Sequence, residues 1–252
     1  MEVIVARNYE DMSKKACAHI VSRIKEKPDL VLGLATGSTP IGLYQNLIAE
    51  YQKNNVSFRR VVTFNLDEYA GLDGNDPNSY RYFMDHQLFN HIDIDKNNTF
   101  IPDGTAENIE EECKNYEALI KKFGGIDLQI LGIGRNGHIG FNEPGSPFNS
   151  RTQYIRLAES TRQANSRFFP SLDDVPTHAI TMGIGTILEA KEILLLISGK
   201  GKQEAVRRLF TEEPNEDFPA SAIKTHPKVF VFVDEDALAS ESGKDLQELL
   251  AK

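Results

Sequence analysis

The chain has 252 residues, of which 40% are hydrophobic and 26% are charged, a balance typical of a globular protein with a substantial core. Its 28 basic and 37 acidic residues give a net charge of 28 − 37 = −9, so we expect neither nucleic acid nor an anionic membrane as a partner. No apolar run approaches about 18 residues, and the first residues lack the pattern of a secretion signal, so we expect a cytoplasmic protein without a membrane span.

Short apolar runs recur along the chain, and each ends in a polar or glycine-rich turn. Such runs indicate strands buried on both faces of a parallel sheet, and they lie at residues 2–6, 30–35, 61–66, 128–134, 178–184, 192–198 and 229–234. Between them, apolar residues about one turn apart predict helices over 9–26, 40–52, 107–123, 160–168 and 202–211. This alternation predicts an α/β fold, a three-layer αβα sandwich with a mostly parallel sheet.

No repeat, linker or low-complexity tract divides the sequence, so we expect one domain over residues 1–252. The two cysteines, Cys17 and Cys113, fall on the apolar faces of predicted helices and are interpreted as buried thiols. No His, Cys and Asp residues have the spacing of metal ligands, and we expect no metal. In open α/β sheets the site lies beyond the carboxyl ends of the strands, so the segments after the strands are the places to search.

The segment LATGSTP (34–40) follows the second predicted strand. Gly37 permits close backbone approach, Ser38 and Thr39 offer hydroxyl groups, and Pro40 suits the first turn of a helix. Backbone N–H groups at such a helix start can bind an anion. The segment therefore indicates either a phosphate site or only a capped helix start.

The segment FNLDEYAG (64–71) places Asp67 and Glu68 where the third predicted strand ends. An isolated acidic pair of this kind is usually solvated or caps a turn. It becomes a candidate catalytic site only if other reactive groups converge on it.

The segment LGIGRNGHIGFNEPG (131–145) matches the glycine pattern of a dinucleotide-binding loop. That pattern must open a helix, and the residues that follow here disfavour one, so we reject a dinucleotide site. The loop presents Asn136, His138 and Glu143, which suggests an acid/base pair. The alternative is a loop histidine bonded only to backbone.

Two basic residues complete the set of candidates. Arg167 lies in STRQANSRFF, and Lys202 lies in SGKGKQEA at another strand-to-helix junction. Each is either a solvated surface cation or a partner for an anion, and its position at a helix start places Lys202 well for an anion.

Taken in order, ATGSTP, FNLDEY, GIGRNGHIGFNEPG, ANSRFF and GKGK closely resemble the glucosamine-6-phosphate deaminase family, from about residue 30 to 234. The resemblance implies a modified Rossmann-like fold. It also implies an enzyme of the hydrolase or isomerase class that converts glucosamine 6-phosphate and water into fructose 6-phosphate and ammonia. That reaction belongs to carbohydrate metabolism, in the degradation of N-acetylglucosamine, and needs no cofactor.

The same resemblance implies roles for individual residues. His138 opens the sugar ring with Glu143 as its partner, and Asp67 moves the C2 proton to C1. Gly37, Ser38, Thr39, Arg167 and Lys202 bind the substrate phosphate. Asn136 stands where many family members have Asp; because an amide does not exchange protons at neutral pH, Asn136 is expected only to orient His138.

Longer family members are hexamers that an acetylated sugar phosphate activates through basic residues. This chain has Gln153 and Ile155 at the matching positions, so we expect no allosteric site and a monomer rather than a hexamer. We also expect residues 146–176 to form a lid that carries Arg167 on a short helix capped by Ser160 or Thr161.

Two other functions fit the same scaffold. A 6-phosphogluconolactonase shares the glycine-rich stretch and the histidine, but would lack the Asn142-Glu143-Pro144 unit. A non-enzymatic sugar-phosphate sensor is the second alternative, since a fold does not fix a function. Such a sensor usually carries a DNA-binding unit, whereas this chain begins with the first predicted strand and retains every proposed acid/base group.

Overall fold

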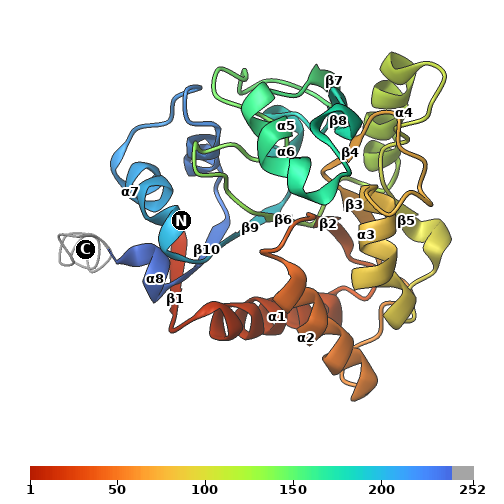
Figure 1. Ribbon diagram of the computed structural model, residues 1–252. Coiled ribbons are helices and arrows are strands. Elements are labelled where there is room, and N and C mark those ends of the chain that lie inside the picture. Colours follow the sequence, from red (N-terminus) through yellow and green to blue (C-terminus); the bar gives the residue numbers. More distant parts are fainter. Residues whose placement is uncertain (240–252) are drawn as a thin grey trace.

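The computed structural model describes residues 1–239, and its largest feature is a seven-stranded sheet in which every neighbouring pair of strands is parallel (Figure 1). In spatial order the sheet contains β1 (Glu2–Ala6), β10 (Val229–Asp234), β9 (Glu192–Ile197), β6 (Leu128–Leu131), β2 (Val31–Leu34), β3 (Val62–Asn65) and β5 (Thr99–Phe100). Sequence-adjacent strands are often separated in this order, as expected for strands joined by helical crossovers.

Side chains alternate between the two faces of the sheet and build two separate cores. On β9, Leu194 and Leu196 pack on the side of α1 (Tyr9–Glu26), α2 (Ile41–Gln52) and α3 (Tyr80–Gln87). Ile193 and Leu195 pack on the side of α4 (Ile109–Lys122), α6 (Ile184–Leu188), α7 (Gln203–Thr211) and α8 (Glu235–Leu238). The predicted three-layer αβα fold is therefore confirmed, with both faces of the sheet covered.

The helix pattern in the sequence agrees with the observed packing. On α1, which begins and ends where predicted, Met12, Ala16 and Ile20 are buried along one face. Cys17 and Cys113 are free and buried as expected, and burial raises the pKa of their thiols to about 12 and about 11. No helix in the described part of the chain is both long and apolar enough to cross a membrane.

A second, three-stranded antiparallel sheet lies beside the first. Its order is β4 (Asp67–Tyr69), β8 (His178–Thr181) and β7 (Gln153–Arg156). The interpretation of residues 178–184 as a strand of the parallel sheet is wrong, because the strand ends at Thr181 and pairs antiparallel with β4 and β7. Asp67 likewise begins β4 rather than ending β3, and the Met182 amide donates to the Leu66 carbonyl where the two sheets meet.

The strand order sets the place of the candidate site. Strands β9, β6, β2 and β3 are neighbours and run parallel, so their carboxyl ends share one edge of the sheet. A candidate segment follows each of these strands: 198–202 follows β9, 132–145 follows β6, 35–40 follows β2, and Asp67 comes just after β3. Four of the five motifs found in the sequence therefore meet at one edge.

Candidate active site

The loop after β2 presents free hydrogen-bond donors. Gly37 has φ +91°, a left-handed conformation that glycine adopts without strain. Within residues 1–239, neither the backbone N–H groups nor the hydroxyl groups of Ser38 and Thr39 donate to any acceptor, and the Gly37 N–H is equally free. Directed N–H and O–H groups before a helix start are the arrangement that binds a phosphate.

Lys202 reaches the glycine-rich loop from the neighbouring strand end. Its ammonium group donates to the Ile133 carbonyl at 2.5 Å, and burial together with the nearby Arg135 lowers the pKa of Lys202. The Arg135 guanidinium lies against the same turn, since a Cβ on Gly201 would stand 3.1 Å from its Nη2 atom. Arg135 is not among the residues predicted from the sequence, although its position directly before Asn136 was an available signal.

Arg167 stands on a different segment of the chain from these two cations. It stands in the 3-10 turn Ser166–Phe168, after the helix α5 (Glu159–Asn165), with its guanidinium 4.6 Å from the centre of the Phe168 ring. Among the described residues it makes no hydrogen bond or ion pair. The structure thus brings Lys202 to the strand-end loops but leaves Arg167 on the separate α5 segment.

Asp67 is buried and has no hydrogen-bond donor among residues 1–239. Burial, with a smaller effect of the Glu68 charge, raises its pKa to about 8. Its Oδ2 atom lies next to the glycine-rich loop, 3.8 Å from where a Cβ on Gly140 would stand. The structure therefore places this carboxyl group beside the segment that carries His138.

Glu68 is adjacent in sequence but has a different task. Its carboxylate accepts hydrogen bonds from the backbone N–H groups of Tyr69, Tyr80 and Arg81, at 2.9, 2.9 and 3.0 Å. Two of these donors open α3, so Glu68 ties the start of that helix to β4. Burial nevertheless outweighs these bonds and raises its pKa to about 7. Glu68 is thus a structural anchor beside Asp67.

His138, Asn136 and Glu143 form one hydrogen-bonded row. Asn136 Nδ2 donates to Glu143 Oε2 at 2.9 Å, so its Oδ1 atom faces His138 and accepts from His138 Nδ1 at 2.8 Å. Because Oδ1 only accepts, the imidazole proton lies on Nδ1 and the Nε2 lone pair is free. The Glu143 carboxylate is 3.9 Å from Nδ1, so it acts on the ring chiefly through Asn136.

The protonation state of His138 follows from its surroundings. Burial lowers its pKa, Glu143 opposes that shift and Lys202 reinforces it. The imidazole is therefore neutral at neutral pH, with Nε2 available to accept a proton.

The cap predicted for the lid helix is wrong. Helix α5 begins after Ala158, and no side chain caps it. The Thr161 hydroxyl instead donates to Glu143 Oε1 at 3.0 Å, and Asn165 Nδ2 donates to the Tyr69 hydroxyl at 2.9 Å. These two polar residues of α5 thus face the candidate site, which the sequence pattern alone did not reveal.

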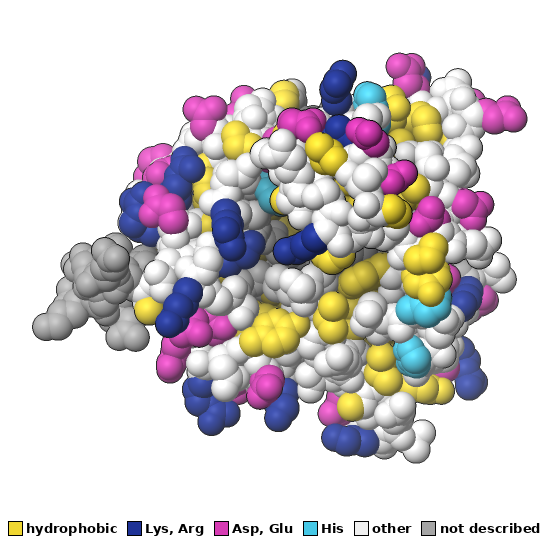
Figure 2. Space-filling model, viewed as in Figure 1, with side chains coloured by type: hydrophobic (Ala, Val, Ile, Leu, Met, Phe, Trp, Pro, Cys, Tyr) yellow, Lys and Arg dark blue, Asp and Glu magenta, His cyan; other side chains and the backbone are white. Residues whose placement is uncertain are grey.

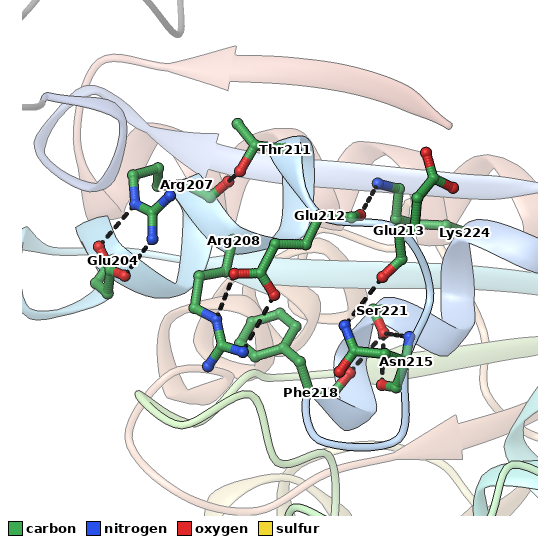
Figure 3. Close-up of polar contacts among 10 residues, drawn as sticks. All are labelled: Glu204, Arg207, Arg208, Thr211, Glu212, Glu213, Asn215, Phe218, Ser221 and Lys224. Atoms are coloured by element: carbon green, nitrogen blue, oxygen red, sulfur yellow. Dashed lines mark hydrogen bonds and ion pairs between the residues drawn. The ribbon is translucent and has the colours of Figure 1, made fainter.

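The segment 208–218, which starts in α7, packs against the glycine-rich loop. Arg208 pairs with Glu212 at 2.8 Å and lies over the Phe218 ring at 4.5 Å (Figure 3). The Phe218 ring in turn fills the space beside Gly137, where a Cβ would stand 2.2 Å from it, and φ at Gly137 is +86°. Only glycine fits this position, one residue before His138.

The surface over these loops is hollowed and rich in cations. Figure 2 shows Lys and Arg side chains around a depression in the middle of the face, with a histidine at its rim. Within residues 1–239, no three His, Cys, Asp or Glu side chains stand where they could hold a metal ion together. The grouped donors are therefore suited to an anion at one end and to proton transfer at the other.

Residues 6–231 match the family of glucosamine-6-phosphate isomerases and 6-phosphogluconolactonases. This chain belongs to that family. Glucosamine-6-phosphate deaminases from Geobacillus sp. (strain WCH70) and Shouchella clausii are 56% and 57% identical to it, over 95% and 97% of this chain and 95% and 99% of theirs. Glucosamine-6-phosphate deaminase 1 of Bacillus subtilis is 55% identical, over 94% of this chain and 98% of its own.

Solved structures divide the family more finely. A structure described as a monomeric glucosamine-6-phosphate deaminase matches with a TM-score of 0.92 and 55% identity, over 94% of this chain and 98% of that one. A 6-phosphogluconolactonase from Thermotoga maritima matches with a TM-score of 0.72 and 21% identity, over 93% and 99%. The lactonase shares the fold, whereas the deaminases also share more than half of the sequence.

Proposed function

We propose that this protein is an enzyme that converts glucosamine 6-phosphate and water into fructose 6-phosphate and ammonia. The observation that carries the proposal is the buried carboxyl group of Asp67, which accepts no hydrogen bond from any described residue and lies beside the loop of His138. The deaminases at 52–57% identity support the same reaction. In the cell it would act in the cytoplasm, in the breakdown of amino sugars.

The phosphate would bind at the cationic end of the site. The free N–H and hydroxyl groups of Gly37, Ser38 and Thr39 supply directed donors, and Lys202 supplies charge from the opposite strand end. Arg167 makes no hydrogen bond or ion pair with any described residue, so its guanidinium would be available to join them when α5 moves. Binding energy from the phosphate would then orient C1 and C2 of the sugar at the acid/base groups.

Ring opening would use the free lone pair of His138. Nε2 accepts the proton of the C1 hydroxyl, the bond between C1 and the ring oxygen breaks, and the ring oxygen receives the proton. The row of Asn136 and Glu143 holds the imidazole in the required tautomer and stabilises it while it is charged.

Asp67 would then act at C2 of the open chain. Its pKa of about 8 means that it must lose a proton first, and the positive amino group of the substrate favours that loss. The carboxylate removes the C2 proton, and return of a proton to C1 leaves an imine at C2. Water adds to this carbon and ammonia leaves, so the net reaction is a hydrolytic deamination that follows an isomerisation.

The direct test supplies three compounds to the purified protein: glucosamine 6-phosphate, glucosamine and 6-phosphogluconolactone. We expect ammonia and fructose 6-phosphate in equal amounts from the first, and turnover of the second to be at least about tenfold weaker because it lacks the phosphate contacts. Acid release from the lactone without ammonia from the amino sugar would instead assign the lactonase activity, and turnover of none would favour the sensor.

A further inference from the structure

Tyr9, the first residue of α1, contacts residues 37–39, the proposed phosphate loop, although Ser38 lies 29 positions further along the chain. Its hydroxyl lies 3.0 Å from the Ser38 carbonyl oxygen and 2.9 Å from the Thr39 carbonyl oxygen, and it accepts a hydrogen bond from the Gly42 N–H at 2.8 Å. One side chain from another helix thus meets both the loop and the start of α2. None of the motifs found in the sequence includes Tyr9.

The bond to Gly42 supplies a cap that α2 lacks locally. Pro40 stands at the cap position and offers no side-chain hydrogen bond, so the first-turn donors of α2 depend on other groups. Tyr9 satisfies one of them from outside the helix. The hydroxyl has a single proton, which the Ser38 and Thr39 carbonyl oxygens share.

These contacts fix the direction of one of the loop's donors, the Thr39 N–H. The peptide bond between Ser38 and Thr39 is trans, so its N–H points away from its carbonyl. Because the Ser38 carbonyl points to Tyr9, the Thr39 N–H points away from α1, where no described residue accepts it. The Thr39 carbonyl is held on the same side, so the two peptide planes cannot turn their oxygens toward an incoming anion.

We infer that Tyr9 is a positioning residue for phosphate recognition: its hydroxyl holds the 37–39 loop with the Thr39 N–H presented to the anion and the Ser38 and Thr39 carbonyl oxygens withdrawn. The inference rests on the proposed phosphate site, but not on the chemistry at C1 and C2. A free loop would offer a mixture of donors and repelling oxygens, and the phosphate would have to select the first arrangement.

Tyr9→Phe tests the inference because it removes the hydroxyl and keeps the ring, which packs against the core between α1 and α2. Tyr51→Phe is the matched control, since Tyr51 packs on the same core and makes no hydrogen bond through its hydroxyl to any described residue. Two measurements are needed: the dissociation constant of inorganic phosphate by calorimetry, and KM and kcat with glucosamine 6-phosphate.

We expect Tyr9→Phe to weaken phosphate binding and raise KM by about two- to tenfold, the worth of one hydrogen bond, with kcat within about twofold of wild type. Tyr51→Phe should change neither. Unchanged phosphate affinity in Tyr9→Phe, equal losses in both variants, or a fall confined to kcat would each overturn the inference. Calorimetry separates this outcome from a failure of the proposed function, because phosphate binding is measured without turnover.

Discussion

Burial shifts the pKa of Asp67 upward and that of His138 downward, and both shifts favour the neutral form. Asp67 therefore holds a proton at neutral pH, while His138 Nε2 presents a lone pair. His138 is therefore in the protonation state that ring opening needs, whereas Asp67 must first lose its proton before it can remove the C2 proton. On the proposed function, the charged amino group of the substrate supplies what Asp67 lacks.

Asn136→Asp tests how the imidazole is controlled. A carboxylate in place of the amide would face the Nδ1 proton and raise the pKa of His138. Since His138 must be neutral to accept a proton, the acidic limb of the pH profile of kcat/KM should move to higher pH. Asn97→Asp, the same change on an exposed turn, is the control. An acidic limb that stays in place would mean that His138 does not govern it.

Asp67→Asn should change stability in a pH-dependent way. Between about pH 4 and pH 8 folded Asp67 keeps a proton that the unfolded chain releases, so its contribution to stability falls as pH rises. The Tm of Asp67→Asn relative to wild type should therefore rise from pH 5 to pH 8. A Tm difference that does not vary with pH would show that Asp67 titrates normally.

Asp127→Asn is the opposite case. Burial opposes the shift, but hydrogen bonds from Lys27, Val31 and Lys191 lower the pKa of Asp127. Wild-type Asp127 thus stabilises the fold above its unfolded pKa, and the variant should lose Tm relative to wild type as pH rises from 3 to 6.

At the scale of elements, hydrogen bonds and ion pairs limit which part of the lid expected over residues 146–176 can move. The Ser150 carbonyl accepts from Gly185, Arg151 pairs with Glu117 and Glu189, and β7 pairs with β8. These ties anchor the first third of the segment. We therefore propose that residues 158–176 move, with Thr161 and Asn165 of α5 as the links to the site.

Hydrogen exchange measures that motion. We expect exchange over residues 158–170 to slow when a non-reactive sugar phosphate binds, because Arg167 meets the phosphate only in the closed state. Thr161→Val should speed exchange of α5 in the empty protein by releasing it from Glu143. Helix α4 is the internal reference. Equal protection of 158–170 with and without the ligand would show that the segment is fixed.

The same elements show what a sequence can predict. Runs buried on both faces and helices with one apolar face follow from local periodicity, and they placed β10 and α1 to the residue. The sheet to which residues 178–181 belong could not be predicted, because a short apolar run does not indicate whether its neighbouring strands are parallel or antiparallel. Threonine is a common helix cap, so the sequence favoured that role for Thr161. Its hydrogen bond to Glu143, 18 positions away, is a tertiary contact that local sequence does not indicate.

The site was predictable where its residues follow strands and less so elsewhere. Gly37, Asp67, His138 and Lys202 all leave neighbouring strand ends, so topology alone brings their loops together. Arg135 and Tyr9 were missed because one looks like a surface cation and the other like a helix start. Their contacts exist only once α1, α2 and the loop after β9 are in place.

At the scale of the molecule, the net charge of −9 coexists with a local group of cations at the strand ends. Screening over about 8 Å confines the influence of distant acids, so the local field can still attract a phosphate. Gln153 and Ile155, at the positions where the longer family members are expected to bind a second phosphate, carry no charge.

We therefore predict that N-acetylglucosamine 6-phosphate does not activate the enzyme and that it works as a monomer. Initial rates against glucosamine 6-phosphate should be hyperbolic with and without the acetylated compound, and light scattering should give the mass of one chain. The solved deaminase structure described as monomeric supports this expectation. A sigmoidal curve that becomes hyperbolic on adding the acetylated sugar phosphate would contradict it.

The most direct test of the account compares ammonia release from glucosamine 6-phosphate by wild type and Asp67→Asn, each checked for phosphate binding by calorimetry. The account predicts ammonia and fructose 6-phosphate in equal amounts from wild type. It also predicts a fall in kcat of about 10²- to 10⁴-fold in Asp67→Asn, with phosphate affinity unchanged. Wild-type rates in Asp67→Asn, or no ammonia from either protein, would contradict it.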